Sequence, residues 1–150
     1  MRTSFALLIA LISFNAHSAD PFWKQGITED RHEITVYRSE SCGCCKAWIE
    51  HLEDHNFAVK DIKVTNVDHY KKNLGVPAEA ASCHTAVVDG VVIEGHVPAQ
   101  DIKRLLTDKG DIRLLTVPRM PSGTPGMDSP GAPKNDFKVF AISNDNNVSV

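Results

Sequence analysis

The chain has 150 residues, of which 42% are hydrophobic and 23% charged, with nine glycines, eight prolines and four cysteines. This composition is typical of a globular protein and excludes collagen-like, coiled-coil and wholly disordered chains. The length suits one domain with a hydrophobic core and is short for two. The formal net charge of −3 and the lack of a basic run argue against a nucleic-acid-binding surface.

Residues 1–19 have the pattern of a secretory signal peptide. A single cation precedes an apolar run over residues 5–14, and small residues follow in Ala16-His17-Ser18-Ala19. Cleavage after Ser18 and cleavage after Ala19 both stay open. The apolar run is too short for a permanent membrane span, and no later segment approaches one. We therefore expect an exported, soluble mature protein.

The first half of the mature chain is predicted to contain two strands and two helices. Apolar residues whose spacing places them on one face of a helix predict a helix directly after a cysteine cluster, with Ser41 as its N-cap. The predicted elements are a strand over 33–37, a helix over 46–55 with the apolar face Cys45, Trp48, Ile49 and Leu52, a strand over 58–64 and a helix over 67–74.

The second half begins with the clearest local pattern, in which Asp89-Gly90 separates two β-rich runs and predicts a tight hairpin of strands 85–88 and 91–94. A helix is predicted over 98–106, beginning at Pro98. The order strand, Cys-bearing helix, strand, helix, hairpin, helix is that of a thioredoxin-like domain. We therefore predict an α/β fold of this type, with a central mixed sheet flanked by helices.

A Pro/Gly-rich extension follows the predicted domain core. Residues 120–133 read as a loop, 137–142 as one more strand, and 143–150 as a flexible polar tail. The predicted domain, including this loop, therefore spans residues 20–142.

Three of the four cysteines lie within Cys42-Gly43-Cys44-Cys45. Such close neighbours can close almost no loop, so a purely structural pair of disulfides explains them poorly. At a helix N-terminus the free N–H groups stabilise thiolates, which serve both as redox nucleophiles and as ligands of soft metals. The spacing directs Cys45 to the core and leaves Cys42 the more exposed sulfur.

The fourth cysteine, Cys83, precedes the hairpin and is followed by His84. In a thioredoxin-like sheet this loop lies beside the start of the first helix, so both residues should approach Cys42; an inert buried cysteine is the alternative. The two methionines beyond Met1, Met120 and Met127, bracket the Pro/Gly loop. Thiolate, thioether and imidazole ligands together favour Cu(I), with zinc as the competing metal.

Most of the remaining side chains that could bind a metal or act in catalysis have simpler interpretations. His51 and His55 are spaced i, i+4, but they lie beside Glu50 and Asp54 and are interpreted as part of a solvated surface. His96 lies in the connection after the hairpin and can either turn toward a site or remain a plain loop residue. No nucleophile elbow, phosphate loop or catalytic carboxylate pair is recognisable, so hydrolase and kinase functions have no support.

Four motifs together resemble the CopG-type family of periplasmic copper-resistance proteins: Cys42-Gly43-Cys44-Cys45, Ser82-Cys83-His84-Thr85, Glu94-Gly95-His96-Val97-Pro98 and the segment Met120 to Met127. The match runs from about Ile34 to Phe140. The resemblance implies a thioredoxin-like fold with a CxCC motif, a multinuclear Cu(I)-thiolate cluster, a periplasmic location, and a role in copper redox interconversion beside copper efflux components.

Carried over residue by residue, the resemblance implies a specific ligand set. Arg119 departs from the family pattern, in which a smaller residue is expected before the first methionine. The implied metal ligands are Cys42, Cys44, Cys45, Cys83, His84, His96, Met120 and Met127.

Three functions remain open at the sequence level. The first is a copper-binding protein in copper resistance, with or without interconversion of Cu(I) and Cu(II). The second is a metal-free thiol–disulfide oxidoreductase in which Cys42 attacks and Cys45 resolves. The third is a passive chaperone that delivers copper to an efflux system. Whether the protein is an enzyme therefore stays open, and no organic cofactor is expected.

Overall fold

The computed structural model describes residues 20–150, and the signal peptide predicted over residues 1–19 lies outside the described part. Within residues 20–150 there is no helix long and apolar enough to cross a membrane. The helices are α1 (Gly43–Asp54), α2 (Val67–Asn73) and α3 (Ala99–Thr107), with short 3-10 helices η1 (Pro21–Lys24) and η2 (Ala78–Ala80). The strands are β1 (His32–Arg38), β2 (Phe57–Lys63), β3 (Thr85–Val88), β4 (Val91–Glu94), β5 (Ile112–Thr116), β6 (Phe140–Ser143) and β7 (Val148–Ser149).

The strands form one mixed sheet in the order β2-β1-β3-β4-β5-β6-β7. Strand β1 pairs parallel with β2 and antiparallel with β3, and β4 pairs antiparallel with β3 and parallel with β5. The predicted order from the first strand to the third helix is observed, and the Asp89-Gly90 hairpin joins β3 to β4. The predicted α/β class with a central mixed sheet is confirmed.

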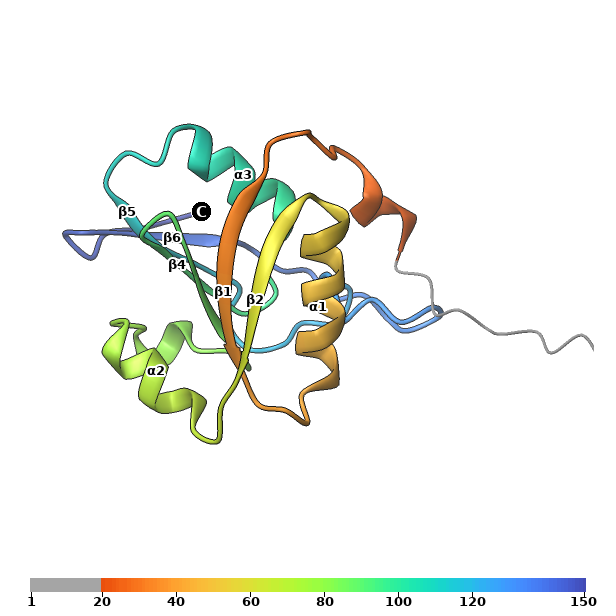
Figure 1. The fold of residues 1–150 in the computed structure, drawn as a ribbon, viewed down its shortest axis with the longest axis horizontal. Coiled ribbons are helices and arrows are strands. Elements are labelled where there is room, and N and C mark those ends of the chain that lie inside the picture. Colours follow the sequence, from red (N-terminus) through yellow and green to blue (C-terminus); the bar gives the residue numbers. More distant parts are fainter. Residues whose placement is uncertain (1–19) are drawn as a thin grey trace, which may run out of the picture.

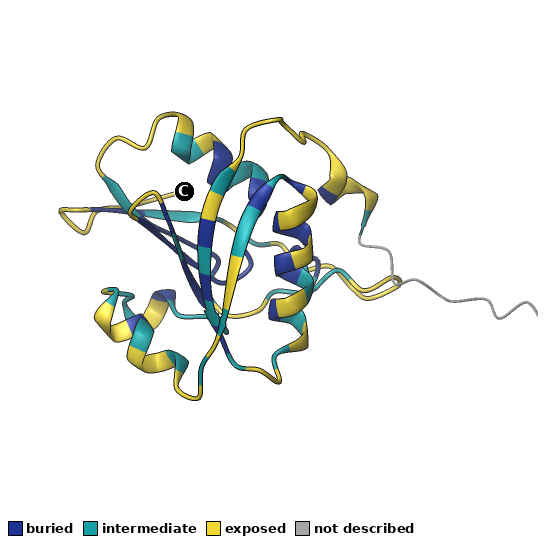
Figure 2. Ribbon diagram, in the orientation of Figure 1, coloured by how far each residue is buried: buried dark blue, intermediate teal, exposed yellow. Residues whose placement is uncertain are grey.

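Helices cover both faces of the sheet, and each face has its own apolar cluster. Trp48 and Leu52 of α1 and Ile102 of α3 pack with β-strand residues including Ile34 and Ile93 in the larger cluster. The smaller cluster combines residues 74–80 with Val92, Leu114 and Ile142. Figure 1 shows α2 apart from α1 and α3, and Figure 2 shows the buried residues along the central strands and one side of α1.

Two parts of the C-terminal half differ from the sequence prediction. Strand β5 was not predicted, because both of its faces are covered: Leu114 packs into the smaller cluster and Leu115 into the larger one, which removes the alternation that marks a strand. The segment predicted as a flexible tail turns after Ser143, the last residue of β6, and returns as β7 along that strand.

The beginning of the described chain is fastened to the Pro/Gly-rich loop. The amide of Asp20 donates to Asp128 Oδ2 at 2.7 Å, and the indole of the buried Trp23 donates to the carbonyl of Gly123 at 3.2 Å. The carbonyl of Trp23 in turn accepts a hydrogen bond from His55 Nε2 at 2.6 Å. This N-terminal strap, residues 20–24, therefore connects helix α1 with the loop that carries the two methionines.

Candidate metal centre

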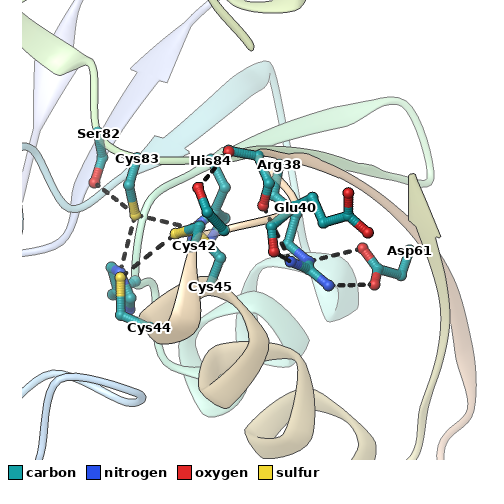
Figure 3. Close-up of a disulfide and its surroundings, with 12 residues drawn as sticks. Arg38, Glu40, Cys42, Cys44, Cys45, Asp61, Ser82, Cys83 and His84 are labelled. Carbon is teal, nitrogen blue, oxygen red and sulfur yellow. Dashed lines mark hydrogen bonds and ion pairs between the residues drawn. A yellow bond between two sulfur atoms is a disulfide. The ribbon is translucent and has the colours of Figure 1, made fainter. Parts of the chain in front are cut away.

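All four cysteines converge at the N-terminal end of helix α1, as the sequence predicted (Figure 3). The sulfur atoms of Cys42, Cys44, Cys45 and Cys83 lie within 4.8 Å of one another. Cys42 and Cys45 are joined by a disulfide, whereas Cys44 and Cys83 are free thiols, and Cys44 Sγ lies 3.6 Å from Cys42 Sγ. The centre therefore has two sulfur donors in this oxidised form and four after reduction of the disulfide.

The start of helix α1 sets the direction of these side chains. The helix begins at Gly43 with Cys42 at the N-cap position, and no side chain among the described residues caps it. Ser41, the predicted N-cap, instead places its hydroxyl 3.1 Å from that of Ser39. Cys45 is buried in the core as predicted, and the uncapped N–H groups of the first turn remain available to thiolates.

An ion pair between the buried Arg38 and the more exposed Asp61 holds the loop that leads into the cluster, and the sequence analysis did not find it. Arg38 ends β1 and donates through Nε and Nη2 to the two carboxylate oxygens of Asp61, at 2.8 and 2.6 Å. Its Nη1 donates to the carbonyls of Ser39 and Glu40, at 3.1 and 3.3 Å. The pairing of Arg38 with Asp61 depends on the parallel register of β1 and β2. Neither the charged residues nor the strand patterns in the sequence predict that register.

His96 has the geometry of a metal ligand. Its Nδ1–H donates to the carbonyl of Pro125 at 2.8 Å, which leaves the lone pair on Nε2, and Nε2 lies 3.1 Å from Cys83 Sγ. A carbonyl that orients the distal nitrogen is the usual arrangement behind a ligating histidine. Of the two interpretations of His96, the structure therefore favours the residue turned toward the site.

His84 is fully buried beside the same thiol. Its Nδ1 lies 3.2 Å from Cys83 Sγ, its ring lies 4.3 Å from the Trp48 ring, and its Nε2 has no hydrogen-bond partner within the described residues. Cys83, His84 and His96 thus form a second group of potential ligands that shares its sulfur with the four-cysteine cluster.

Burial favours the uncharged forms of Cys83, His84 and His96. Desolvation, followed by the neighbouring Cys44, raises the pKa of Cys83 to about 12. Burial and the charges of His96 and Lys71 hold the pKa of His84 well below its usual range. The pKa of His96 is also lowered by burial, against the opposing effects of the Pro125 carbonyl and Asp128. The histidine nitrogens are consequently neutral bases, as metal coordination requires.

The Pro/Gly-rich loop reaches the cluster through its backbone. Gly126 has a φ of +81°, and a Cβ atom there would lie 2.7 Å from the carbonyl oxygen of Cys44 and 2.7 Å from the amide nitrogen of Trp48. Met127, the next residue, is half-buried. The structure therefore brings one end of the loop against the start of α1, beside Cys44.

Met120 and Arg119 lie at the other end of this loop and face outward. Met120 is 50% exposed and lines a cavity of about 860 Å³ with Pro77, Phe137 and Phe140. Arg119 is exposed, and only its backbone is engaged, by the Ala81 carbonyl and the Ser82 hydroxyl. The structure does not bring Met120 into the four-cysteine cluster.

The interpretation of His51 and His55 as a solvated surface is wrong. Both are buried, at 5% and 0% exposure, because the N-terminal strap and α3 cover this side of α1. His51 Nε2 accepts a hydrogen bond from the amide of Ala99 at 3.0 Å. The polar neighbours Glu50 and Asp54 are exposed, but the sequence held no sign that residues far away would cover the histidines.

Thiol and imidazole donors at these separations fit a soft metal ion. Sulfur atoms within 4.8 Å of one another can bridge ions, and neutral imidazole nitrogens suit copper as well as zinc. Reduction of the Cys42–Cys45 disulfide is required before all four sulfurs can serve as ligands. The donor set therefore fits copper, and the oxidised pair adds a site for exchange with other thiols.

Comparison with solved structures identifies the family. The structure described as "Copper resistance protein copG- Form 2" shares 41% sequence identity, with a TM-score of 0.76 over 80% of this chain and 95% of that chain. "Copper resistance protein copG- Form 1" shares 42% identity, with a TM-score of 0.73 over 78% and 92%. The chain belongs to the CopG family.

A family described as "Protein of unknown function, DUF411" matches residues 80–127 of this CopG family member. That match includes Cys83, His84 and His96 and ends at Met127, whereas the three cysteines of α1 precede it. No curated protein matches the chain.

Proposed function

We propose that the chain is a periplasmic copper-binding protein that holds Cu(I) in copper resistance. Its thiolates form a multinuclear cluster with several copper ions, because bridging sulfurs allow few ligands to hold several ions. Similarity to structures described as copper resistance proteins supports this function. The proposed ligands are Cys42, Cys44, Cys45 and Cys83, completed by His84, His96 and Met127. Met120, which faces outward, would join them only after its end of the loop moves toward the cluster.

The observation that carries the proposal is that Cys83 belongs to both groups of potential ligands. Its sulfur lies within 4.8 Å of the three sulfurs of α1 and also 3.1 Å from the free nitrogen of His96. A single structural zinc ion needs only four ligands, whereas this chain gathers four sulfurs and two imidazoles around one end of a helix. This surplus of soft donors favours a cluster of copper ions.

Metal content of the reduced chain tests the proposal. Mature protein is purified anaerobically after export, titrated with Cu(I) and analysed for copper and zinc. We expect several copper ions per chain, and loss of most of them when Cys42, Cys44 and Cys45 are all changed to serine. Ser41→Ala, an exposed change in the same loop, should keep the wild-type copper count. Preferential retention of one zinc ion would contradict the proposal.

Interconversion of the two copper oxidation states is the finer part of the proposal. Reduction of two Cu(II) ions to Cu(I) takes two electrons, which the thiols of Cys42 and Cys45 supply as they form their disulfide and release two protons. A dithiol reductant must then restore the pair. Turnover of Cu(II) with such a reductant is compared for wild type and Cys44→Ser. A wild-type rate no higher than that of free copper would leave a chaperone role.

The Cys42–Cys45 disulfide favours one second candidate, a metal-free thiol–disulfide oxidoreductase. Replacement of Met120 and Met127 by leucine separates the two functions, since thioethers have no part in disulfide exchange. If copper binding is the function, copper affinity or stoichiometry falls in the double variant. Unchanged copper binding, together with rapid exchange of the Cys42–Cys45 disulfide, would instead support the oxidoreductase.

A further inference from the structure

A fully buried carboxylate lies behind the metal centre without touching it. Glu94, the last residue of β4, is 0% exposed, and its two carboxylate oxygens accept three hydrogen bonds. Its Oε1 accepts from the amide of Ser82 at 2.6 Å and from Lys71 Nζ at 2.5 Å, and its Oε2 accepts from the hydroxyl of Thr85 at 2.6 Å. Lys71 Nζ also donates to the Thr85 hydroxyl at 2.9 Å.

Glu94 lies at the start of one segment that supplies a ligand around Cys83, and its partner Ser82 lies in the other. Ser82 directly precedes Cys83, and Glu94 itself is followed by Gly95 and His96. The carboxylate thus ties the backbone before the thiol to the backbone before the imidazole. Cys83 Sγ and His96 Nε2, which follow the two connected backbone segments, lie 3.1 Å apart.

Gly95 shows how closely the two segments approach. Its φ is +72°, and a Cβ atom there would lie 2.5 Å from the hydroxyl oxygen of Ser82 and 2.6 Å from the carbonyl oxygen of Val117. Its amide donates to the carbonyl of His84 at 3.1 Å. The segments are therefore in direct contact, and a shift of Ser82 is transmitted to both Cys83 and His96.

The side chain of Glu94 lies on the opposite face of the sheet from α1. Val92, two residues earlier on the same strand, packs in the smaller cluster with residues 74–80, and successive odd or even strand positions share a face. Lys71, its ion-pair partner, comes from α2 and has a side chain only 9% exposed. The hydrogen bonds of Glu94 therefore reach the centre through the backbone of Ser82 and not through a ligand side chain.

Stability alone does not account for a charged pair at this position. A buried ion pair loses so much hydration that apolar residues of similar volume are often equally stabilising. A carboxylate can, however, accept from an amide, a hydroxyl and an ammonium group at once, in one fixed geometry. At the junction of the two ligand segments, the carboxylate of Glu94 accepts from all three kinds of donor.

We propose that Glu94, with Lys71 as its counter-ion, is a positioning residue that sets the distance between Cys83 and His96 for copper binding. This inference rests on the proposed function for its role in copper affinity. Its geometric part, the placement of a thiol beside an imidazole, concerns the metal-free protein as well.

The test compares Glu94→Gln with Val92→Ala in the reduced, full-length mature protein. The glutamine keeps one oxygen acceptor but loses the charge and one acceptor, whereas Val92→Ala weakens the same strand on the same face without touching the two ligand segments. Competition with a Cu(I) chelator should show roughly 10–100-fold weaker binding for Glu94→Gln, the range found when residues behind metal ligands are changed. Val92→Ala should bind like wild type.

X-ray absorption and NMR supply readouts that general destabilisation would leave unchanged. We expect Glu94→Gln to weaken the copper–imidazole signal in X-ray absorption, because His96 is displaced while His84 stays, and, without metal, to shift the ring resonances of His96. Wild-type His96 resonances in Glu94→Gln, or equal effects of the two substitutions, would overturn the inference. If the wild-type chain binds no copper, the proposed function fails, and the metal-free resonances still decide the role of Glu94.

A second variant covers the case in which Glu94→Gln does not fold. Thr85→Val keeps the branched shape and removes one donor to Glu94 Oε2, so the carboxylate remains with Lys71 and Ser82. It should move the His96 resonances in the same direction by a smaller amount. Unchanged resonances in a folded Thr85→Val protein would contradict a positioning role.

Discussion

Gly126 is the residue at which the Pro/Gly-rich loop meets the backbone of α1. Because the atoms nearest to its hypothetical Cβ belong to the main chain of Cys44 and Trp48, a side chain can be accommodated only if the loop withdraws. We expect Gly126→Ala to lower the free energy of unfolding by roughly 1–3 kcal/mol more than Gly131→Ala does. Denaturant unfolding measures this difference.

Gly131 is a matched control because its φ of +79° is close to that of Gly126, while a Cβ atom there would meet nothing within 4 Å. Both substitutions therefore carry the same backbone strain, and only one carries the steric conflict. Equal losses of stability would show that the loop does not need its close contact with α1.

The thiols of the centre could be predicted from the sequence far better than their supports. Cys45 falls on the apolar helical face, and Cys83 precedes a hairpin whose Asp-Gly turn is unmistakable, so their convergence follows from local patterns. Glu94 lies in a predicted strand and Arg38 directly after one, but their importance comes from partners 23 residues away that no periodicity reveals.

Helices α1 and α3 are joined by a hydrogen bond that requires a neutral histidine. Burial, with a smaller contribution from the charge of His55, lowers the pKa of His51 from 6.5 to about 3. Below pH 6.5 the unfolded chain therefore binds a proton at His51, whereas the folded chain binds it only as the pH approaches 3. The stabilisation is complete above pH 6.5 and is lost as the pH falls toward 3, by an amount on the order of 3–5 kcal/mol.

The variant His51→Gln isolates this contribution, since its amide oxygen can still accept from the Ala99 amide but does not titrate. Unfolding free energies of both proteins are measured from pH 7.5 to pH 3. The difference between wild type and variant should change across this interval, because the carboxylates that also titrate there are common to both. Parallel curves would show that folding does not shift the pKa of His51.

The sequence predicted the elements from β1 to α3 within one residue, except for the start of α1, which lies three residues before the predicted start. It did not predict how the elements cover one another. His51 and His55 resemble surface residues because their neighbours on α1 are charged. Their burial depends on Trp23 and Ala99, which come from segments 32 and 48 residues away. Likewise β5 lacks alternation because the sheet is covered on both faces, a property of the assembled molecule.

At the scale of the whole molecule, the N-terminal strap fastens the Pro/Gly-rich loop. Trp23 is 8% exposed and contacts both the loop and α1. We expect Trp23→Ala to reduce the free energy of unfolding by about 3–5 kcal/mol and to make residues 120–136 more sensitive to proteolysis. Limited proteolysis followed by mass spectrometry locates the cuts.

Phe22 provides the matched control for this prediction. It is the neighbouring aromatic residue, it is 58% exposed, and it meets only the edge of the Trp23 ring, at a centroid distance of 4.9 Å. Phe22→Ala should cost no more than about 1.5 kcal/mol and should leave the cleavage pattern unchanged. New cuts in residues 120–136 in both variants would show that the segment opens without regard to Trp23.

The strap also bears on the order in which the molecule folds. Its hydrogen bonds join residues 100 and 108 positions apart, whereas the Cys42–Cys45 disulfide spans only three. Contacts between distant residues form late because the intervening chain must first be ordered. The cysteines of α1 can therefore meet metal or oxidant in a chain whose loop has not yet docked. The pair of Cys83 and His96, only 13 residues apart, forms before the loop adds the Pro125 carbonyl and Met127.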